Sequence, residues 1–352
     1  SGTAYRPLDE ITLTESVTLF AQWADKNYIA QVDDAKYDSL ADAFAAGATI
    51  DVQNHRLELT GEQYAAANVT FTDTANWPAF SRYRFKEDES PDGNIDIGAV
   101  FLYEDGNRFS TSFTSVTSGP NAAYNAAQLF DSNTLSRWAN WNNYKYDDFW
   151  VAATYAAPHR VTKYEWYTYD TVTRAPTSWR LQGSNDGVNW TDLDVQTNMR
   201  VATKAKSLSF TGMIKDGFAS HGELRVTVPE GASVTSAVAT LAGHIRLVKA
   251  GGGTLTASKT GLLYCGGTQV EAGTLMAGQN GSAQPYGAPG CAVSVASNAV
   301  FELNAKYDQF FNTFELAGGT LQNTVNLADP GKKAQVVNLR LTADSTYRVS
   351  QT

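Results

Sequence analysis

Residues 176–190 read PTSWRLQGSNDGVNW, and this stretch says most about the fold. Trp179 and Leu181 alternate with polar residues, which is the pattern of a strand with one face in a core. Asn185-Asp186-Gly187 then predicts a tight turn, because glycine tolerates a positive φ there. Trp190 follows on the return strand, where we expect it to cover the same core. The stretch is therefore typical of scaffold in an antiparallel β-sandwich.

The composition agrees with a β-rich protein that has many turns. The chain has 352 residues, of which 43% are hydrophobic and only 18% charged, so we expect two or three packed domains. The net charge is −9 and no basic stripe stands out, which argues against binding to nucleic acid or to an anionic membrane surface. No apolar run is long enough to predict a transmembrane helix. The chain begins with Ser1, and we expect it to be a fragment of a longer polypeptide.

The first 77 residues change their pattern twice. Residues 11–23 alternate apolar and polar side chains and predict a strand or a hairpin. Residues 37–50 place apolar side chains at helical spacing and predict one short helix. The period of two then returns and predicts buried strand positions at Ile50, Val52, Leu57 and Leu59.

Two further zones divide the rest of the chain. Residues 78–215 are rich in aromatic side chains, and strand-like runs alternate with turns, as in an antiparallel sandwich. Residues 216–352 contain short alternating strands that end at Gly or Asn, with no helix between them. Such quasi-repeats predict a β-solenoid, in which each rung buries an aliphatic row against the next. The alternative is a second β-sandwich.

Two motifs in the second zone resemble the discoidin, or coagulation-factor type C, family. They are NAAQLFDSNTLSRW (125–138) and the PTSWRLQGSNDGVNW hairpin (176–190), supported by residues 83–107. The resemblance implies a galactose-binding-like jelly roll. In the third zone, YCGGTQVEAGTLMAG (264–278) and FELAGGTLQNT (314–324) resemble autotransporter passenger repeats, which implies a right-handed β-helix on a cell surface. Residues 2–23 resemble half of an internalin-type β-grasp repeat.

Together these patterns predict an all-β protein, a right-handed β-helix that carries an inserted or adjacent discoidin-like jelly roll. The expected division is a partial β-grasp-type repeat (1–30), a helix cap with the first rung (31–77), the β-sandwich (78–215) and the remaining β-helix (216–352). In the inserted arrangement the solenoid resumes near Gly222, and the two ends of the sandwich lie close together. The alternative is an arrangement of beads on a string.

The sequence offers little for catalysis. None of the four histidines has a partner at metal-ligand spacing, and no nucleophile elbow occurs. The triple glycine 251–253 is not followed by Lys-Ser or Lys-Thr, so a solenoid corner explains it better than a phosphate loop. We therefore predict a protein that is not an enzyme. A polysaccharide-active β-helix remains an alternative, because carboxylates from different rungs could assemble on one face.

One cation site follows from the discoidin resemblance. Asp131 and Thr134 match the turn in which that family holds a cation, and oxygen ligands from a tight turn suit Ca²⁺. The family usually adds a Glu from the adjoining strand, where this chain has Ala99. The alternative is that Asp131 only organises its own turn. The two cysteines, Cys265 and Cys291, lie in one glycine-rich stretch and predict a disulfide, with two buried thiols as the alternative.

Two loops of the sandwich contain the residue types that bind sugars, namely aromatic rings, amides and charged groups. The resemblance places both loops at the ligand end of the jelly roll. The candidate glycan-binding residues are Trp141, Asn142, Tyr144, Asp170 and Arg174. The alternative is that these aromatic side chains pack against the solenoid. Trp138 and Trp150 are expected in the core.

These observations predict a secreted or bacterial cell-surface segment that acts as an adhesin or glycan-binding module on a β-helical stalk. Its expected partners are glycans or host cell-surface polysaccharides. The first alternative is a structural protein that assembles with itself into fibres or arrays through exposed strand edges.

Overall fold

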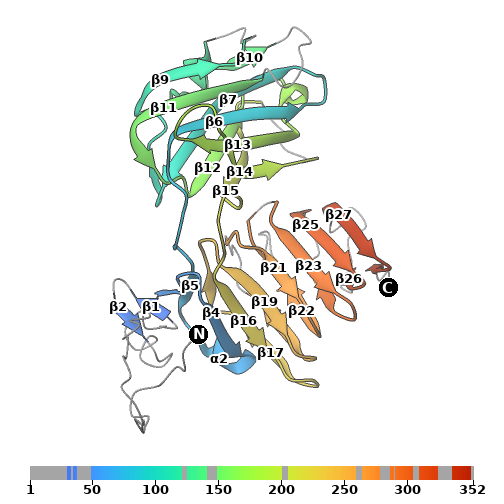
Figure 1. Ribbon diagram of the computed structural model, residues 1–352. Helices are drawn as coiled ribbons and strands as arrows, with labels where there is room; N and C mark the ends of the chain where they lie inside the picture. The colour runs from blue at the N-terminus through green and yellow to red at the C-terminus, as the bar shows by residue number, and fades with distance from the viewer. Residues whose placement is uncertain are drawn as a thin grey trace, which may run out of the picture.

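The computed structural model describes residues 30–32, 35–37, 49–120, 125–140, 149–199, 205–258, 264–277, 286–288, 290–303, 309–323 and 335–349. Figure 1 shows a β-solenoid with a β-sandwich beside it, joined by two connecting segments. The predicted all-β fold class is thus confirmed. The predicted β-grasp repeat lies outside the described residues, as does most of the helix predicted over 37–50. Of the helices in the described ranges, none is long and apolar enough to cross a membrane.

Two parallel sheets form the walls of the solenoid. The first has the spatial order β4 (Arg56–Thr60), β16 (Glu223–Thr227), β19 (Arg246–Ala250), β21 (Thr268–Val270), β23 (Ala292–Ala296), β25 (Gln309–Ala317) and β27 (Gln335–Ala343). The second has the order β17 (Ser233–Ser236), β20 (Thr254–Ala257), β22 (Thr274–Ala277), β24 (Val300–Glu302), β26 (Thr320–Asn323) and β28 (Thr346–Val349). Each later rung contributes one strand to each sheet, as the quasi-repeats predicted.

The first rung is built differently. Two of its strands, β3 (Thr49–Asp51) and β5 (Thr70–Thr72), lie in a third sheet, whose spatial order is β18 (Thr240–Leu241), β5, β3, β1 (Ala30–Val32) and β2 (Ala35–Tyr37). A short helix, α2 (Gly61–Ala66), lies against β17, where a strand of the second sheet would otherwise continue. Thr60 and Gln63 close its first turn as a capping box, so the helix begins where β4 ends.

Aliphatic rows through the rungs make the solenoid core. Leu57, Leu224 and Leu247 lie side by side on β4, β16 and β19 and are all buried. The predicted inward positions at Ile50, Val52 and Leu59 are buried too. The triple glycine forms the corner after β19 as predicted, because a Cβ on Gly253 would lie 2.2 Å from a backbone carbonyl of the previous rung.

The sandwich consists of two antiparallel sheets. One has the order β10 (Trp138–Asn140), β7 (Ile95–Glu104), β12 (Lys163–Thr168) and β15 (Leu208–Met213), with β8 (Asn107–Arg108) also paired to β7. The other has the order β14 (Thr191–Gln196), β13 (Ser178–Ser184), β6 (Phe80–Glu89), β11 (Trp150–His159) and β9 (Phe113–Ser118). We call this second sheet the five-strand sheet. Two short 3₁₀ helices, η1 (Ala126–Phe130) and η3 (Val172–Arg174), lie in the loops.

The hairpin that identified the fold is largely as predicted. Trp179 and Leu181 are fully buried in the sandwich core, and Gly187 has a φ of 77° in the turn. Trp138 is also in the core. Trp190 and Trp150 were predicted there wrongly: both are only half-buried. The guanidinium of Arg84, an outward-facing residue of β6, lies over both rings, so they belong to the outer face of the five-strand sheet.

The sandwich is inserted into the solenoid rather than strung after it. All of its strands fall between β5 and β16 in the sequence, yet β16 pairs in parallel with β4, from Glu223 opposite Arg56 to Thr227 opposite Thr60. The sandwich therefore interrupts the first rung in the sequence, but the strand pairing of the solenoid continues directly from β4 to β16.

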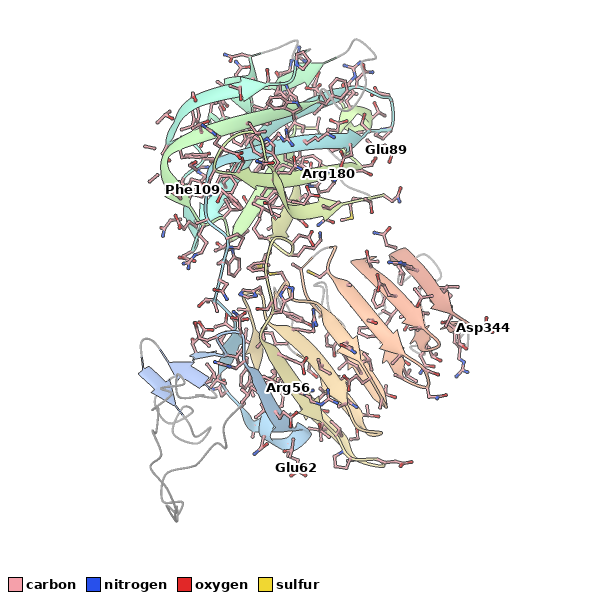
Figure 2. All side chains as sticks on the ribbon, viewed as in Figure 1. Arg56, Glu62, Glu89, Phe109, Arg180 and Asp344 are labelled. Atoms are coloured by element: carbon pink, nitrogen blue, oxygen red, sulfur yellow. The ribbon has the colours of Figure 1, made fainter. Side chains whose placement is uncertain are left out.

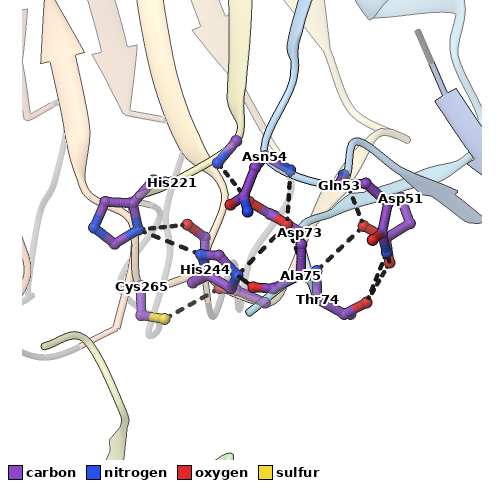
Figure 3. A network of polar contacts seen from close by, with 11 residues as sticks. Asp51, Gln53, Asn54, Asp73, Thr74, Ala75, His221, His244 and Cys265 are labelled. Carbon is purple, nitrogen blue, oxygen red and sulfur yellow. Dashed lines mark hydrogen bonds and ion pairs between the residues drawn. The ribbon is translucent and has the colours of Figure 1, made fainter. Parts of the chain in front are cut away.

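A buried polar network pins the two connecting segments together (Figure 3). The Asp73 carboxylate accepts hydrogen bonds from the backbone N–H groups of Asn54 (3.2 Å), Ala75 (3.0 Å) and Gly222. His244 contacts the Ala75 carbonyl through Nε2 (2.6 Å), and the ring of Phe218 stacks on it with centroids 4.1 Å apart. Outgoing and returning chains thus meet at one point on the solenoid.

The cysteines correct one prediction. The structure holds Cys265 and Cys291 as two buried thiols, not as the expected disulfide. The Sγ of Cys265 donates to the Gly243 carbonyl (3.3 Å), and the Sγ of Cys291 donates to the Cys265 carbonyl (3.5 Å). Burial raises the pKa of Cys291 to about 12, so the thiolate needed for exchange chemistry is disfavoured. Both side chains pack with Ala288 where the sandwich approaches the solenoid.

Candidate functional site

The loops at one end of the sandwich gather four charged side chains. Asp96 lies near the start of β7 and pairs with Ala139 of β10, while Arg137 immediately precedes β10. Asp170 and Arg174 lie in the loop between β12 and β13. Figure 2 labels Glu89 near this end of the sandwich and Phe109 near the opposite end. We call Asp96, Arg137, Asp170 and Arg174 the loop-end site.

Asp96 is the unusual member of the loop-end site. Its side chain is 0% exposed, and neither oxygen accepts a hydrogen bond from a side chain among the described residues. The nearest cation is Arg137, with its Nη1 4.0 Å from Oδ2. Burial raises the pKa of Asp96 to about 6, and the charges of Arg137 and Arg174 limit the rise. Near neutral pH it is mostly a carboxylate, a form that the Asp170 backbone N–H also favours.

Contacts with the turn between β6 and β7 hold Arg174 in place. Its Nε lies 3.2 Å from Oδ2 of Asp92, which belongs to the turn between β6 and β7. The backbone N–H of Asp92 in turn donates to the Thr173 carbonyl at 3.2 Å, so the turn and η3 are joined. About a third of the Arg174 side chain is exposed (31%). The guanidinium is therefore both fixed and accessible.

An aromatic side chain lies beside the charges. The Arg137 guanidinium is 5.2 Å and the Lys206 ammonium 5.1 Å from the centroid of the Tyr169 ring. Tyr169 is half-buried. The loop end thus offers a carboxylate acceptor, cationic donors and an aromatic ring, which are the groups that recognise polyhydroxylated ligands.

A second buried carboxylate lies in the same half of the sandwich. Glu87 of β6 pairs with Trp179 of β13 and is 0% exposed, and the Ser90 side chain is the hydrogen-bonding group near its carboxyl. Burial raises the pKa of Glu87 well above its usual range. Burial therefore favours the neutral form of Glu87, whereas the charges of Arg137 and Arg174 favour the charged form of Asp96.

The predicted site residues have different outcomes. Trp141, Asn142 and Tyr144 lie outside the described residues. Asp170 and Arg174 are both close enough to Asp96 to affect its pKa, so the structure brings them together. Sequence reasoning missed Asp96 and Arg137. A signal existed for Asp96: it is a charge flanked by Ile95 and Ile97 in a strand that is buried on both faces.

The predicted calcium ligands lie in a self-contained turn. Oδ1 of Asp131 accepts a hydrogen bond from the Asn133 backbone (2.8 Å), and the Ser136 hydroxyl bonds to both carboxylate oxygens (3.0 and 2.8 Å). Gly98 lets this turn approach β7, since a Cβ there would lie 2.9 Å from the Thr134 carbonyl. Within the described ranges no group of three or more His, Cys, Asp or Glu could hold a metal. Calcium binding thus stays a prediction.

Comparison with known proteins supports the sandwich assignment. Residues 111–218 match the F5/8 type C domain, the discoidin-like family of β-sandwiches. The matched span contains β9 to β15, and β6 and β7 complete the same two sheets from residues before it. The chain has no significant match among curated proteins or solved structures. The autotransporter and internalin resemblances gain no support from these comparisons.

Proposed function

We propose that this protein is a non-catalytic glycan-binding module carried on a β-solenoid stalk, which acts at a bacterial cell surface or in the extracellular space. F5/8 type C domains commonly bind carbohydrates or other ligands. The observation that carries the proposal is the loop-end site, where the buried Asp96 carboxylate lies beside Arg137 and Arg174. A sugar hydroxyl can donate to the exposed Asp170 carboxylate while the partly exposed guanidinium groups of Arg137 and Arg174 donate to sugar oxygens, and the buried Asp96 carboxylate helps to hold these guanidinium groups.

Binding to immobilised galactosides and to a glycan array tests the proposal. Wild-type protein should bind saturably, and Arg174→Ala should weaken binding about tenfold, because one charge-assisted hydrogen bond is lost. Arg160→Ala is the matched control: Arg160 pairs with Asp105 near the β7–β8 turn, at the other end of β7. A wild-type protein that binds no glycan, or an Arg174→Ala variant with unchanged affinity, contradicts the proposal. Release of reducing ends from a polysaccharide would contradict the non-catalytic part.

A second candidate function is self-assembly, and the last rung of the solenoid favours it. Leu339 (43%), Leu341 (60%) and Tyr347 (50%) are exposed on β27 and β28, in the register of inward residues of earlier rungs. Exposed apolar side chains along a sheet edge favour contact with further strands, either of the same polypeptide or of a second copy. Electron microscopy and light scattering test this candidate. Filaments or a concentration-dependent mass that Leu341→Lys abolishes would support it, and a strict monomer would exclude it.

A further inference from the structure

The outer face of the five-strand sheet carries an arginine between two tryptophans. The guanidinium carbon of Arg84, on β6, lies 4.2 Å from the ring centroid of Trp190 and 5.4 Å from that of Trp150. The two rings come from the start of β11 and the loop before β14, on either side of β6 in the sheet. We call Trp150, Arg84 and Trp190 the Trp-Arg platform.

Hydrogen bonds across neighbouring strands fix the platform. Nε of Arg84 donates to Oε1 of Gln182 on β13 (2.7 Å), and Nε2 of Gln182 donates to Oδ1 of Asp192 on β14 (2.7 Å). Gln182 is only 7% exposed although it points to the outer face. A buried amide in a chain of short hydrogen bonds holds the guanidinium in one orientation, so little conformational entropy remains to be lost on binding.

Among the described residues no carboxylate forms an ion pair with Arg84, although Asp192 lies close enough to raise its pKa. Arg180 neutralises both nearby acids: its Nε contacts Asp88 (2.7 Å) and its Nη1 contacts Asp192 (3.2 Å). Figure 2 labels Arg180 on this sheet. The Nη groups of Arg84 donate to no partner among the described residues, and arginine stays charged in proteins although burial lowers the pKa here. Arg84 is therefore a fixed cation whose two Nη groups remain available as donors.

From this geometry we propose that the Trp-Arg platform binds an acidic saccharide. The Nη groups of Arg84 take a carboxylate or sulfate group through paired hydrogen bonds, and the indole rings pack against the C–H faces of the sugar. The chain carries a net charge of −9, which repels long polyanions such as nucleic acid more strongly than short anionic units. The platform lies on the five-strand sheet, whereas Asp96 lies on the other sheet. The two sites are thus independent.

Isothermal titration with three trisaccharides tests the inference: trigalacturonate, a sulfated galactose trisaccharide and neutral galactotriose. Wild-type protein should bind at least one acidic probe about tenfold more tightly than galactotriose, with an affinity that falls as salt rises. Binding of the uronate only, or of the sulfated sugar only, supports the inference and identifies whether the platform recognises a carboxylate or a sulfate group. Failure of both acidic probes to bind overturns it.

Variants separate the platform from the loop-end site. Arg84→Gln and Trp190→Ala should each weaken acidic-probe binding about tenfold, and Arg84→Lys should fall between, since lysine keeps the charge but loses the planar fork. Arg174→Ala should bind the acidic probe as wild type does, even if it has lost galactoside binding. Thermal melting checks each fold, and Trp190→Ala carries the test if Arg84→Gln is unstable. Wild-type affinity in folded Trp190→Ala, or loss of acidic-probe binding in Arg174→Ala, overturns the inference.

Discussion

Asp96 shows how one residue can couple ligand binding to pH. Burial favours its neutral form, and the neighbouring Arg137 and Arg174 favour its charged form, so its pKa settles at about 6. An ordinary aspartate has a pKa of 3.8 and would be almost fully charged throughout the mildly acidic range. The carboxylate is the form that attracts the Arg137 and Arg174 guanidinium groups, so its loss at low pH weakens the hold on both.

The first prediction concerns this titration. Galactoside affinity should rise from pH 5 to pH 7, as Asp96 loses its proton, and level off above pH 7. Asp96→Asn should remove most of this pH dependence and weaken binding about tenfold at pH 7.5. The same variant should be no less stable than wild type at that pH, because a raised folded pKa means that ionisation destabilises the fold. Titration calorimetry at several pH values measures the first effect, and a flat wild-type profile contradicts it.

Lys249 is a second residue whose environment opposes its charge. It occupies an inward register position of the solenoid, between Val226 and Val270, and its side chain is buried. Its Nζ donates to the carbonyls of Ala250 (2.9 Å), Gly251 (2.7 Å) and Ala272 (3.0 Å) at the glycine corner. Burial lowers the pKa of Lys249 to about 8.

The second prediction follows from the sign of that shift. Between pH 8 and the ordinary lysine pKa of 10.5 the unfolded chain holds a proton on Lys249 that the folded chain has released, so stability should rise with pH across this window. Below pH 8 both states are protonated and the contribution is constant. Urea unfolding of wild type and Lys249→Met at pH 7.5, 8.5 and 9.5 measures the difference. Parallel profiles for the two proteins would show that Lys249 does not titrate in this way.

At the scale of elements, helix α2 marks the end of the second sheet. The Thr60 hydroxyl accepts from the Gln63 N–H (3.2 Å), and Oε1 of Gln63 accepts from the Thr60 N–H (2.8 Å). Tyr64 on this helix is buried against Phe71 of β5. The helix thus covers a part of the first rung that no later strand covers.

The third prediction tests the cap. Thr60→Ala should lower the free energy of unfolding by about 1 kcal/mol, because it leaves a helix N–H without its acceptor. Thr227→Ala is a matched control: it pairs with Thr60 in the next rung and is exposed, but it caps no helix. Its effect should stay within about 0.5 kcal/mol. Equal losses in the two variants would show that strand propensity, not capping, accounts for the change.

Elements with a clear period could be predicted from the sequence, and those that depend on distant partners could not. Alternation identified Trp179 and Leu181 as core, and Ile50 to Leu59 as inward strand positions. Alternation failed for Trp190, because it separates the two faces of a strand but does not predict which side chains a large ring will contact. Arg84 stacks on Trp190 from a strand far away in the sequence. Helix α2 was missed because its six residues are too few to show a period.

At the scale of the whole molecule, the insertion was predictable because both flanks of the sandwich show solenoid patterns. The loop-end site was only partly predictable. Asp170 and Arg174 stand in a polar loop, whereas Asp96 is hidden in an apolar strand and Arg137 follows a turn. The proximity of these four residues depends on how three loops pack together in the fold. The spacing of the residues along the chain does not predict that packing.

The fourth prediction concerns the insertion. Replacement of residues 78–217 by a short glycine linker should leave the solenoid folded, because Asp73 already contacts the Gly222 N–H and the β4–β16 register does not involve the sandwich. Circular dichroism should keep the β spectrum, and unfolding should stay cooperative. Some loss of stability is expected where Trp77 and Phe218 lose partners in the sandwich. An unfolded product would show that the solenoid needs the sandwich to form.

The pinned junction also has a mechanical consequence. A pull on the two ends of the chain reaches the β4–β16 ladder and the bond between Asp73 and Gly222 before it reaches any strand of the sandwich. These contacts join the two segments that enter and leave the sandwich. The sandwich therefore bears no load until these contacts break. A stalk stretched by flow could therefore lengthen or bend while the module at its side keeps its shape.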